Sequence, residues 1–152
     1  MPINAGRVVA GGLLAGVVMN AVDFLGNGVW LADRWRSEAG ALNARLVDPA
    51  YESGAMAGWI ATDFLLGMLL VWVYAAMRPR FGAGPGTAIK AALFVWAISH
   101  IAYGSFVFTG MYSSGLVLMS SLAGLAAAIA GGLAGAWMYR EDDALARRMA
   151  RS

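Results

Sequence analysis

The chain has 152 residues, of which 60% are hydrophobic and only 13% are charged, and its formal net charge is +2. About a quarter of the residues in a soluble domain are charged, so this composition excludes an ordinary soluble domain and indicates an integral membrane protein. Cysteine is absent, which excludes disulfides, thiol nucleophiles and cysteine metal sites.

The first apolar segment covers residues 6–31 and is too long to be the core of a cleaved signal peptide. It predicts a transmembrane helix, because about 20 residues cross the hydrocarbon core of a bilayer. Asn20, Asp23 and Asn27 are spaced three and four residues apart within it, so they share one helix face. A carboxyl group at mid-bilayer is costly, so this face should point towards other helices or a wet cavity.

Residues 32–53 form the only long loop, and within residues 32–47 the apolar residues recur at steps of three and four. This pattern predicts a short amphipathic helix that lies in the membrane interface. Asp48 and Pro49 then supply a helix N-cap and a proline at the first helical position. We expect the amphipathic helix to be a lid on the membrane surface; the alternative is a platform for a partner.

Three further apolar segments, residues 54–77, 87–109 and 113–139, predict three more transmembrane helices. The connection from Arg78 to Gly86 contains two prolines and three glycines and should end the helix before it. Residues 140–152 form a charged tail. The predicted fold is therefore all-α: a single transmembrane domain over residues 1–152, built as an antiparallel four-helix bundle with an interfacial helix in its first outer loop.

The basic residues are distributed unevenly between the two ends of this bundle. Only Arg34, Arg36 and Arg45 fall on one side, whereas eight of the eleven fall on the other: Arg7, Arg78, Arg80, Lys90, Arg140, Arg147, Arg148 and Arg151. The positive-inside rule predicts that both termini are cytoplasmic.

Polar residues also interrupt the other three helices, with Asp63 in the second, His100 in the third, and Ser120 and Ser121 in the fourth. Counted from the outer helix ends, Asp23, Asp63, His100 and Ser121 all lie about 12–14 Å deep at 1.5 Å per residue. We therefore predict one polar layer. Its main members are Asp23, Asp63 and His100, assisted by Asn20 and Asn27, and Ser120 and Ser121 are secondary members.

Two carboxylates and a protonated imidazole would carry a net charge of −1 in a low dielectric, which favours uptake of a proton or a cation. Oxygen and imidazole ligands suit divalent metals, so Asp23, Asp63 and His100 are candidate metal ligands. The same groups suit proton relay. In the alternative interpretation, the polar side chains only join helices by hydrogen bonds. His100 is also a candidate axial ligand of a haem or chlorophyll-type pigment, with Ala97 and Gly104 leaving room beside the ring.

Three glycine pairs have the small-x-x-x-small spacing that permits close helix packing, namely Gly12/Gly16, Gly54/Gly58 and Gly131/Gly135. They indicate a tight bundle, and the fourth helix is a candidate contact with a second copy or another subunit.

Three stretches of the chain carry a resemblance: the opening AGRVVAGGLLAGVVMNAVDFLGNGVWLADRW, the central VWVYAAMRPRFGAGPGTAIKAALFVWA and the closing LAGAWMYRE. Through them the chain resembles a group of small bacterial membrane proteins of about this length that has no assigned activity. The resemblance implies a four-helix protein of the bacterial inner membrane, and no functional residue is carried over from it.

Two functions are consistent with these patterns. The first is a membrane protein that binds or relays a proton or a metal cation in its polar layer. The alternative is a non-catalytic accessory subunit of a larger membrane complex of respiratory or photosynthetic type. We expect contact with the lipid bilayer, assembly as a homo-oligomer or as a subunit of a complex, and no nucleic-acid partner. No serine nucleophile with its base is recognisable, so we do not expect an enzyme.

Overall fold

The computed structural model describes residues 3–139, and this part of the chain is helical, without strands. The helix α1 (Ala5–Asp23) continues as a π-helix over Phe24–Trp30, and α2 (Ala32–Leu42) is followed by a 3₁₀ turn at Ala44–Val47. The remaining helices are α3 (Pro49–Phe81), α4 (Pro85–Phe108) and α5 (Ser114–Tyr139). The predicted tail at residues 140–152 lies outside the described residues.

Four segments are long and apolar enough to cross a membrane: Ala5–Trp30, Pro49–Phe81, Pro85–Phe108 and Ser114–Tyr139. The all-α class is therefore confirmed, and so is the presence of four helices long and apolar enough to cross a membrane. The shortest of them has 24 residues, about 36 Å of helix, which exceeds the roughly 30 Å thickness of a hydrocarbon core.

The helix α3 begins where the sequence predicted but ends later than predicted. The carboxylate of Asp48 accepts a hydrogen bond from the Ala50 amide at 2.9 Å, and Pro49 is the first helical residue, as expected. The helix, however, continues through Pro79 to Phe81, so the prediction that it ends at residue 77 was wrong. A proline in the last turn removes only one backbone donor, and the Gly82 amide closes that turn on the Arg78 carbonyl at 2.9 Å.

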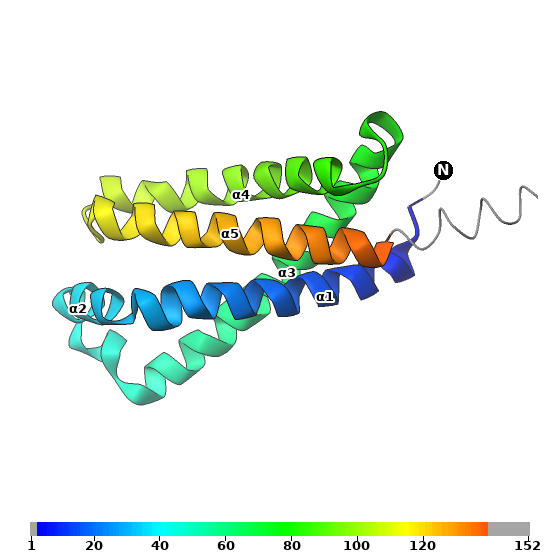
Figure 1. Ribbon diagram of the computed structural model, residues 1–152. Helices are drawn as coiled ribbons and strands as arrows, with labels where there is room; N and C mark the ends of the chain where they lie inside the picture. Colours follow the sequence, from blue (N-terminus) through cyan, green and yellow to red (C-terminus); the bar gives the residue numbers. More distant parts are fainter. Residues whose placement is uncertain (1–2, 140–152) are drawn as a thin grey trace, which may run out of the picture.

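The helices pack around α1 and α5, which lie side by side, with α4 against α5 and α3 crossing α1 obliquely (Figure 1). Glycines allow the closest approaches. A Cβ atom at Gly12 would lie 2.6 Å from the Met68 Cα atom of α3, and one at Gly131 would lie 2.9 Å from the Ala15 carbonyl oxygen of α1. Two of the three predicted glycine pairs thus lie at helix contacts.

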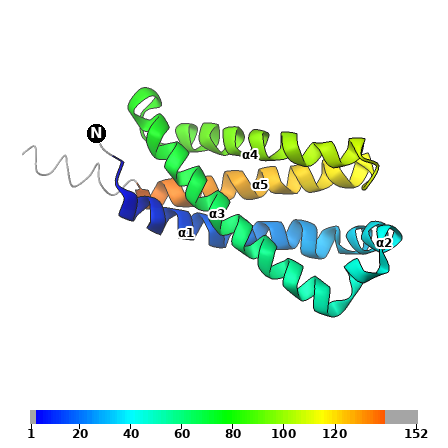
Figure 2. The same cartoon turned by 180° about the vertical axis from the view of Figure 1, so that it is seen from behind.

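The buried core occupies the part of the molecule remote from α2. One cluster includes Val71, Tyr74 and Ala88, and a second includes Leu70, Ala92 and Ala127. The first half of α3 leaves the other helices, as Figure 2 shows from behind. There Gly54 and Gly58 have no atom within 4 Å of a built Cβ, so the third glycine pair makes no helix contact among the described residues.

Candidate functional site

Asp23 ends α1 and is the first member of a chain of hydrogen bonds that leads to α2. The Asn27 side-chain amide donates to the Asp23 carboxylate at 2.7 Å, and the Trp35 indole N–H donates to the Asn27 amide oxygen at 3.1 Å. The Trp35 ring in turn packs edge-on against Tyr112, with 5.1 Å between ring centroids. The predicted pairing of Asp23 with Asn27 along one helix face is therefore present, and Trp35 completes it.

Asn20 has a different role from the one expected. Its amide donates to the Gly16 carbonyl at 2.9 Å and to the Ile60 carbonyl of α3 at 3.3 Å, so it joins two helices instead of contacting a carboxylate. This contact lies one turn from Asp63, whose half-buried carboxylate accepts no hydrogen bond within residues 3–139.

His100 is oriented by α4 and accommodated by α5. Its Nδ1 atom lies 3.0 Å from the Trp96 carbonyl oxygen, and its ring stacks on the Trp96 indole with 5.4 Å between ring centroids. Because a carbonyl only accepts, this contact requires a proton on Nδ1. The other nitrogen, Nε2, occupies space above Gly124, where a Cβ atom would lie only 2.7 Å away. Gly124 thus lets the imidazole approach α5.

Ser120 and Ser121 behave differently from each other. Ser120 is buried beside the Tyr103 hydroxyl. The Tyr103 hydroxyl is itself buried and forms no hydrogen bond within residues 3–139. Ser121 contributes its backbone carbonyl, which accepts from the Trp96 indole at 2.9 Å. Tyr103 was not predicted, although it follows His100 by three residues and therefore shares its helix face.

No hydrogen bond or ion pair joins Asp23, Asp63 and His100 to one another within residues 3–139, so the structure does not show the predicted polar layer as a connected site. All three are half-buried, whereas full burial was expected. The physical reason is the departure of α3, which leaves one side of the layer uncovered.

The residue types suggest two kinds of bound group, a metal ion and a haem or chlorophyll-type pigment. No set of three His, Asp or Glu side chains in the described part of the chain is placed to hold a metal ion. Asp23, Asp63 and His100 therefore form no ready three-ligand metal site. A pigment also fits poorly at His100, because Nδ1 contacts the Trp96 carbonyl and Nε2 faces Gly124. The hollow beside the ring has a volume of about 210 Å³ and is lined by Trp96, Ala97, His100, Ile101 and Ser121.

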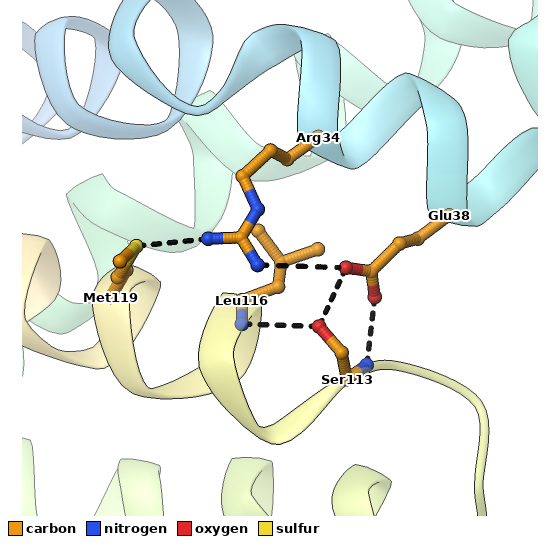
Figure 3. Close-up of polar contacts among 5 residues, drawn as sticks. All are labelled: Arg34, Glu38, Ser113, Leu116 and Met119. Atoms are coloured by element: carbon orange, nitrogen blue, oxygen red, sulfur yellow. Dashed lines mark hydrogen bonds and ion pairs between the residues drawn. The ribbon is translucent and has the colours of Figure 1, made fainter.

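A second polar cluster fixes α2 to the turn between α4 and α5 (Figure 3). The Glu38 carboxylate accepts hydrogen bonds from the Ser113 amide at 2.7 Å and from the Ser113 hydroxyl at 2.6 Å. The same hydroxyl accepts from the Leu116 amide at 3.3 Å, and Arg34 lies 4.0 Å from Glu38 and 3.0 Å from the Met119 sulfur. Glu38 therefore places a negative charge at the N-terminus of α5, where the helix dipole favours it.

The protonation of Glu38 follows from these contacts. Partial burial raises the pKa of Glu38, but the hydrogen bonds from Ser113 and the charge of Arg34 outweigh it and leave the pKa below its usual 4.5. A carboxyl group with a lowered pKa in the folded state stabilises the fold above its unfolded-state pKa, and this contribution is lost as the pH falls. The contact between α2 and α5 should therefore weaken below about pH 4.5.

Replacing Glu38 by glutamine is expected to lower the free energy of unfolding by about 1–2 kcal/mol, because the amide cannot accept both hydrogen bonds from Ser113. The measurement is thermal unfolding in detergent micelles at several pH values. The difference from the wild type should shrink as the pH falls below about 4.5, where Glu38 itself becomes protonated.

The control is Glu52→Gln, which breaks an exposed ion pair with Arg36 at 2.9 Å. Exposed pairs contribute up to about 1 kcal/mol, so this change should have the smaller effect. Equal losses in the two variants, or a Glu38→Gln effect independent of pH, would contradict the assignment of Glu38 as the contact that holds α2.

Comparisons of the chain with protein-family models, with curated proteins and with solved structures found no match. The resemblance to small bacterial membrane proteins stays a prediction, and the candidate site is argued from its geometry alone.

Proposed function

We propose that the chain is a multi-pass protein of the bacterial inner membrane in which α1, α3, α4 and α5 cross the bilayer as an antiparallel bundle. Both termini are cytoplasmic and α2 lies in the outer interface. This proposal is supported by the four apolar helices and by the charge distribution. Among the described residues, Arg7, Arg78, Arg80 and Lys90 belong to the end remote from α2, whereas all acids outside the apolar spans lie near α2.

Within this bundle, the function supported best is the binding and relay of a proton by Asp23, Asp63 and His100. The proposal rests on the placement of three ionisable side chains: Asp23 on α1, Asp63 on α3 and His100 on α4 are each half-buried within apolar helices. No described lysine or arginine lies within these parts of the helices to neutralise the acids. Two carboxylates in a low dielectric are stabilised when they share a proton.

The geometry supports a proton over a metal ion as the cargo. A divalent cation needs several ligands at fixed distances, and no such group of side chains is present in residues 3–139. A proton needs only groups that exchange it in sequence, either directly or through water. In this proposal, water reaches Asp63 and His100 from their exposed sides, because both residues are only half-buried.

Asn27 and Trp35 connect Asp23 to α2 by hydrogen bonds, and we propose that they act as a gate for protons in the relay. Asn27 and Trp35 donate hydrogen bonds in series to Asp23, but an indole N–H and an amide are not acids or bases near neutral pH. In this proposal, a proton from the α2 side reaches the Asp23 oxygen that Asn27 covers only when Trp35 and Asn27 move. Because Glu38 and Ser113 fix α2, their contact controls that movement.

The proposal is tested by proton flux into vesicles that contain the purified protein, with a potassium gradient and valinomycin as the driving force. Asp23→Asn, Asp63→Asn and His100→Ala should each lower the flux by about tenfold or more, which corresponds to about 1.4 kcal/mol in the barrier. The matched control is Asp33→Asn, the same substitution at an exposed position of α2, and it should leave the flux unchanged.

A wild type that moves no more protons than empty vesicles would overturn the proposal. So would equal losses in Asp33→Asn and Asp23→Asn, because the effect would then not depend on the polar layer.

The second candidate function is a non-catalytic accessory subunit of a larger membrane complex. It is favoured by the exposed first half of α3. A Cβ atom at Gly54 or Gly58 would have no neighbour within 4 Å, and Trp59 is 64% exposed. In this case the polar residues serve helix packing, and the purified chain alone moves no protons. The flux measurement therefore separates the two candidates.

A further inference from the structure

The end of the molecule remote from α2 carries two cations that share one aromatic ring. The Arg80 guanidinium carbon lies 6.0 Å from the centroid of the Phe81 ring, and the Lys90 ammonium nitrogen lies 5.6 Å from the same centroid. Arg80 belongs to the last turn of α3 and Lys90 to the second turn of α4. Two positive charges from different helices are thus brought together on one exposed side chain.

The turn between α3 and α4 is fixed by hydrogen bonds, so this arrangement is built into the fold. The Thr87 hydroxyl contacts the Gly82 carbonyl at 2.8 Å and the Phe81 carbonyl at 3.3 Å. The Gly84 amide donates to the Tyr74 hydroxyl at 3.2 Å. Phe81 is therefore held at the surface, where half of its area is exposed.

The acids of the described part of the chain lie too far away to neutralise this pair. The acid closest in sequence is Asp63, which precedes Arg80 by 17 residues on the same helix. At 1.5 Å per residue this is about 25 Å, beyond the roughly 8 Å over which exposed charges interact at physiological salt. Within residues 3–139 neither Arg80 nor Lys90 forms an ion pair. Two adjacent cations without an acid repel each other, and an anion between them lowers the energy.

The position of Arg80 and Lys90 in the fold indicates which kind of anion binds between them. Phe81 ends a helix long enough to cross the bilayer, and Lys and Arg next to the end of such a helix are attracted to anionic lipid headgroups. Arg and Lys bind phosphate oxygens, the guanidinium through two donors in one plane and the ammonium as a point charge. Arg78, in contrast, turns inward over the rings of Tyr74 and Tyr139, at 5.9 and 5.1 Å, and is no part of this surface.

We propose that Arg80, Phe81 and Lys90 form a binding site for the phosphate of an anionic phospholipid headgroup at the end of the bundle where α3 turns into α4. The two cations contact the headgroup phosphate while the exposed Phe81 ring rests against the upper acyl chain. The site is separate from the polar layer, so it stands whether or not the protein moves protons.

The experiment is native mass spectrometry of the purified full chain with added phosphatidylglycerol or phosphatidylcholine. Arg80→Gln and Lys90→Gln should each weaken binding of phosphatidylglycerol by about fivefold, and the double variant by about 25-fold. Binding of phosphatidylcholine should be the same in all variants. Arg80→Lys keeps the charge and should bind within about twofold of the wild type.

The control is Arg45→Gln, an exposed arginine near α2, which should leave lipid binding unchanged. An excess of inorganic phosphate should fail to displace the lipid, because free phosphate makes no contact with Phe81. The proposal is overturned if the double variant binds phosphatidylglycerol as the wild type does, or if Arg45→Gln has an equal effect. Displacement of the lipid by inorganic phosphate would also overturn it, since the site would then bind a free anion. Circular dichroism of each variant confirms that the helices are retained.

Discussion

Gly67→Ala is expected to push α1 and α3 apart and to lower the free energy of unfolding by about 1–3 kcal/mol. A Cβ atom at Gly67 would lie 2.7 Å from the Gly12 carbonyl oxygen and 2.7 Å from the Gly16 backbone nitrogen. Both neighbours are backbone atoms of a helix, which cannot rotate away as a side chain can. Alanine favours the helical state over glycine by about 1 kcal/mol, so helix propensity alone would stabilise the variant. Any net loss of stability therefore comes from the steric clash.

The matched control is Gly58→Ala on the same helix, where a new Cβ atom meets nothing within 4 Å. This variant should be as stable as the wild type or slightly more stable. Thermal unfolding of both variants in the same detergent provides the measurement. If Gly67→Ala unfolds like Gly58→Ala, α1 and α3 do not approach each other as closely as the structure has them.

The same crossing also positions part of the polar layer. Asn20 contacts the Ile60 carbonyl one turn from Asp63, and this contact depends on the approach of the two helices at Gly16 and Gly67. A shift of α3 would move Asp63 away from Asp23. We therefore expect Gly67→Ala to lower proton flux as well as stability, whereas Gly58→Ala should change neither.

The sequence was sufficient to predict the elements that depend on local chemistry. Long apolar runs identify the four membrane-crossing helices, and Asp48 with Pro49 identifies the start of α3. The π-helix at Phe24–Trp30 was not predicted, because no residue pattern in that run differs from an ordinary transmembrane helix. The continuation of α3 through Pro79 was missed for a related reason: a proline is costly in a helix interior but not in a last turn.

The arrangement of the helices could be predicted only in part. In a membrane protein the lipid-facing and core-facing residues are both apolar, so periodicity does not reveal which face packs. Glycine pairs were the one available signal, and they marked the crossings at Gly12/Gly16 and at Gly131/Gly135 but also the uncovered pair Gly54/Gly58. The departure of α3 from the bundle, which leaves Asp63 half-buried, could not be derived from the sequence.

The members of the candidate site that were missed are neutral side chains. A search for charged residues within apolar runs finds Asp23, Asp63 and His100, because such residues are costly there. It passes over Trp35, which contacts Asn27, and Tyr103, which follows His100, because aromatic residues are ordinary in membrane helices. It also passes over Gly124, whose role becomes visible only when the imidazole of His100 is placed above it.

Gly124→Ala is expected to reduce proton flux by about tenfold, to the level of His100→Ala, while the fold keeps its stability. A Cβ atom at this position would lie 2.7 Å from Nε2 and 3.0 Å from Cε1 of the imidazole. These are the end atoms of a side chain, so the ring moves and the helices stay in place. The displaced ring loses its contact with the Trp96 carbonyl, now at 3.0 Å, and the imidazole no longer occupies its place in the proposed relay.

The matched control is Gly104→Ala on α4, one turn beyond His100, where a Cβ atom meets nothing within 4 Å. Flux and thermal unfolding are measured together for both variants. A loss of flux in Gly124→Ala with unchanged unfolding, and no loss in Gly104→Ala, assigns the effect to the position of the imidazole. The double variant Gly124→Ala/His100→Ala should then be no worse than His100→Ala, because the ring that alanine displaces is already gone. Additive losses in the double variant would mean that Gly124 acts on the relay by a route other than His100, and the proposed role of Gly124 in positioning the imidazole would have to be abandoned.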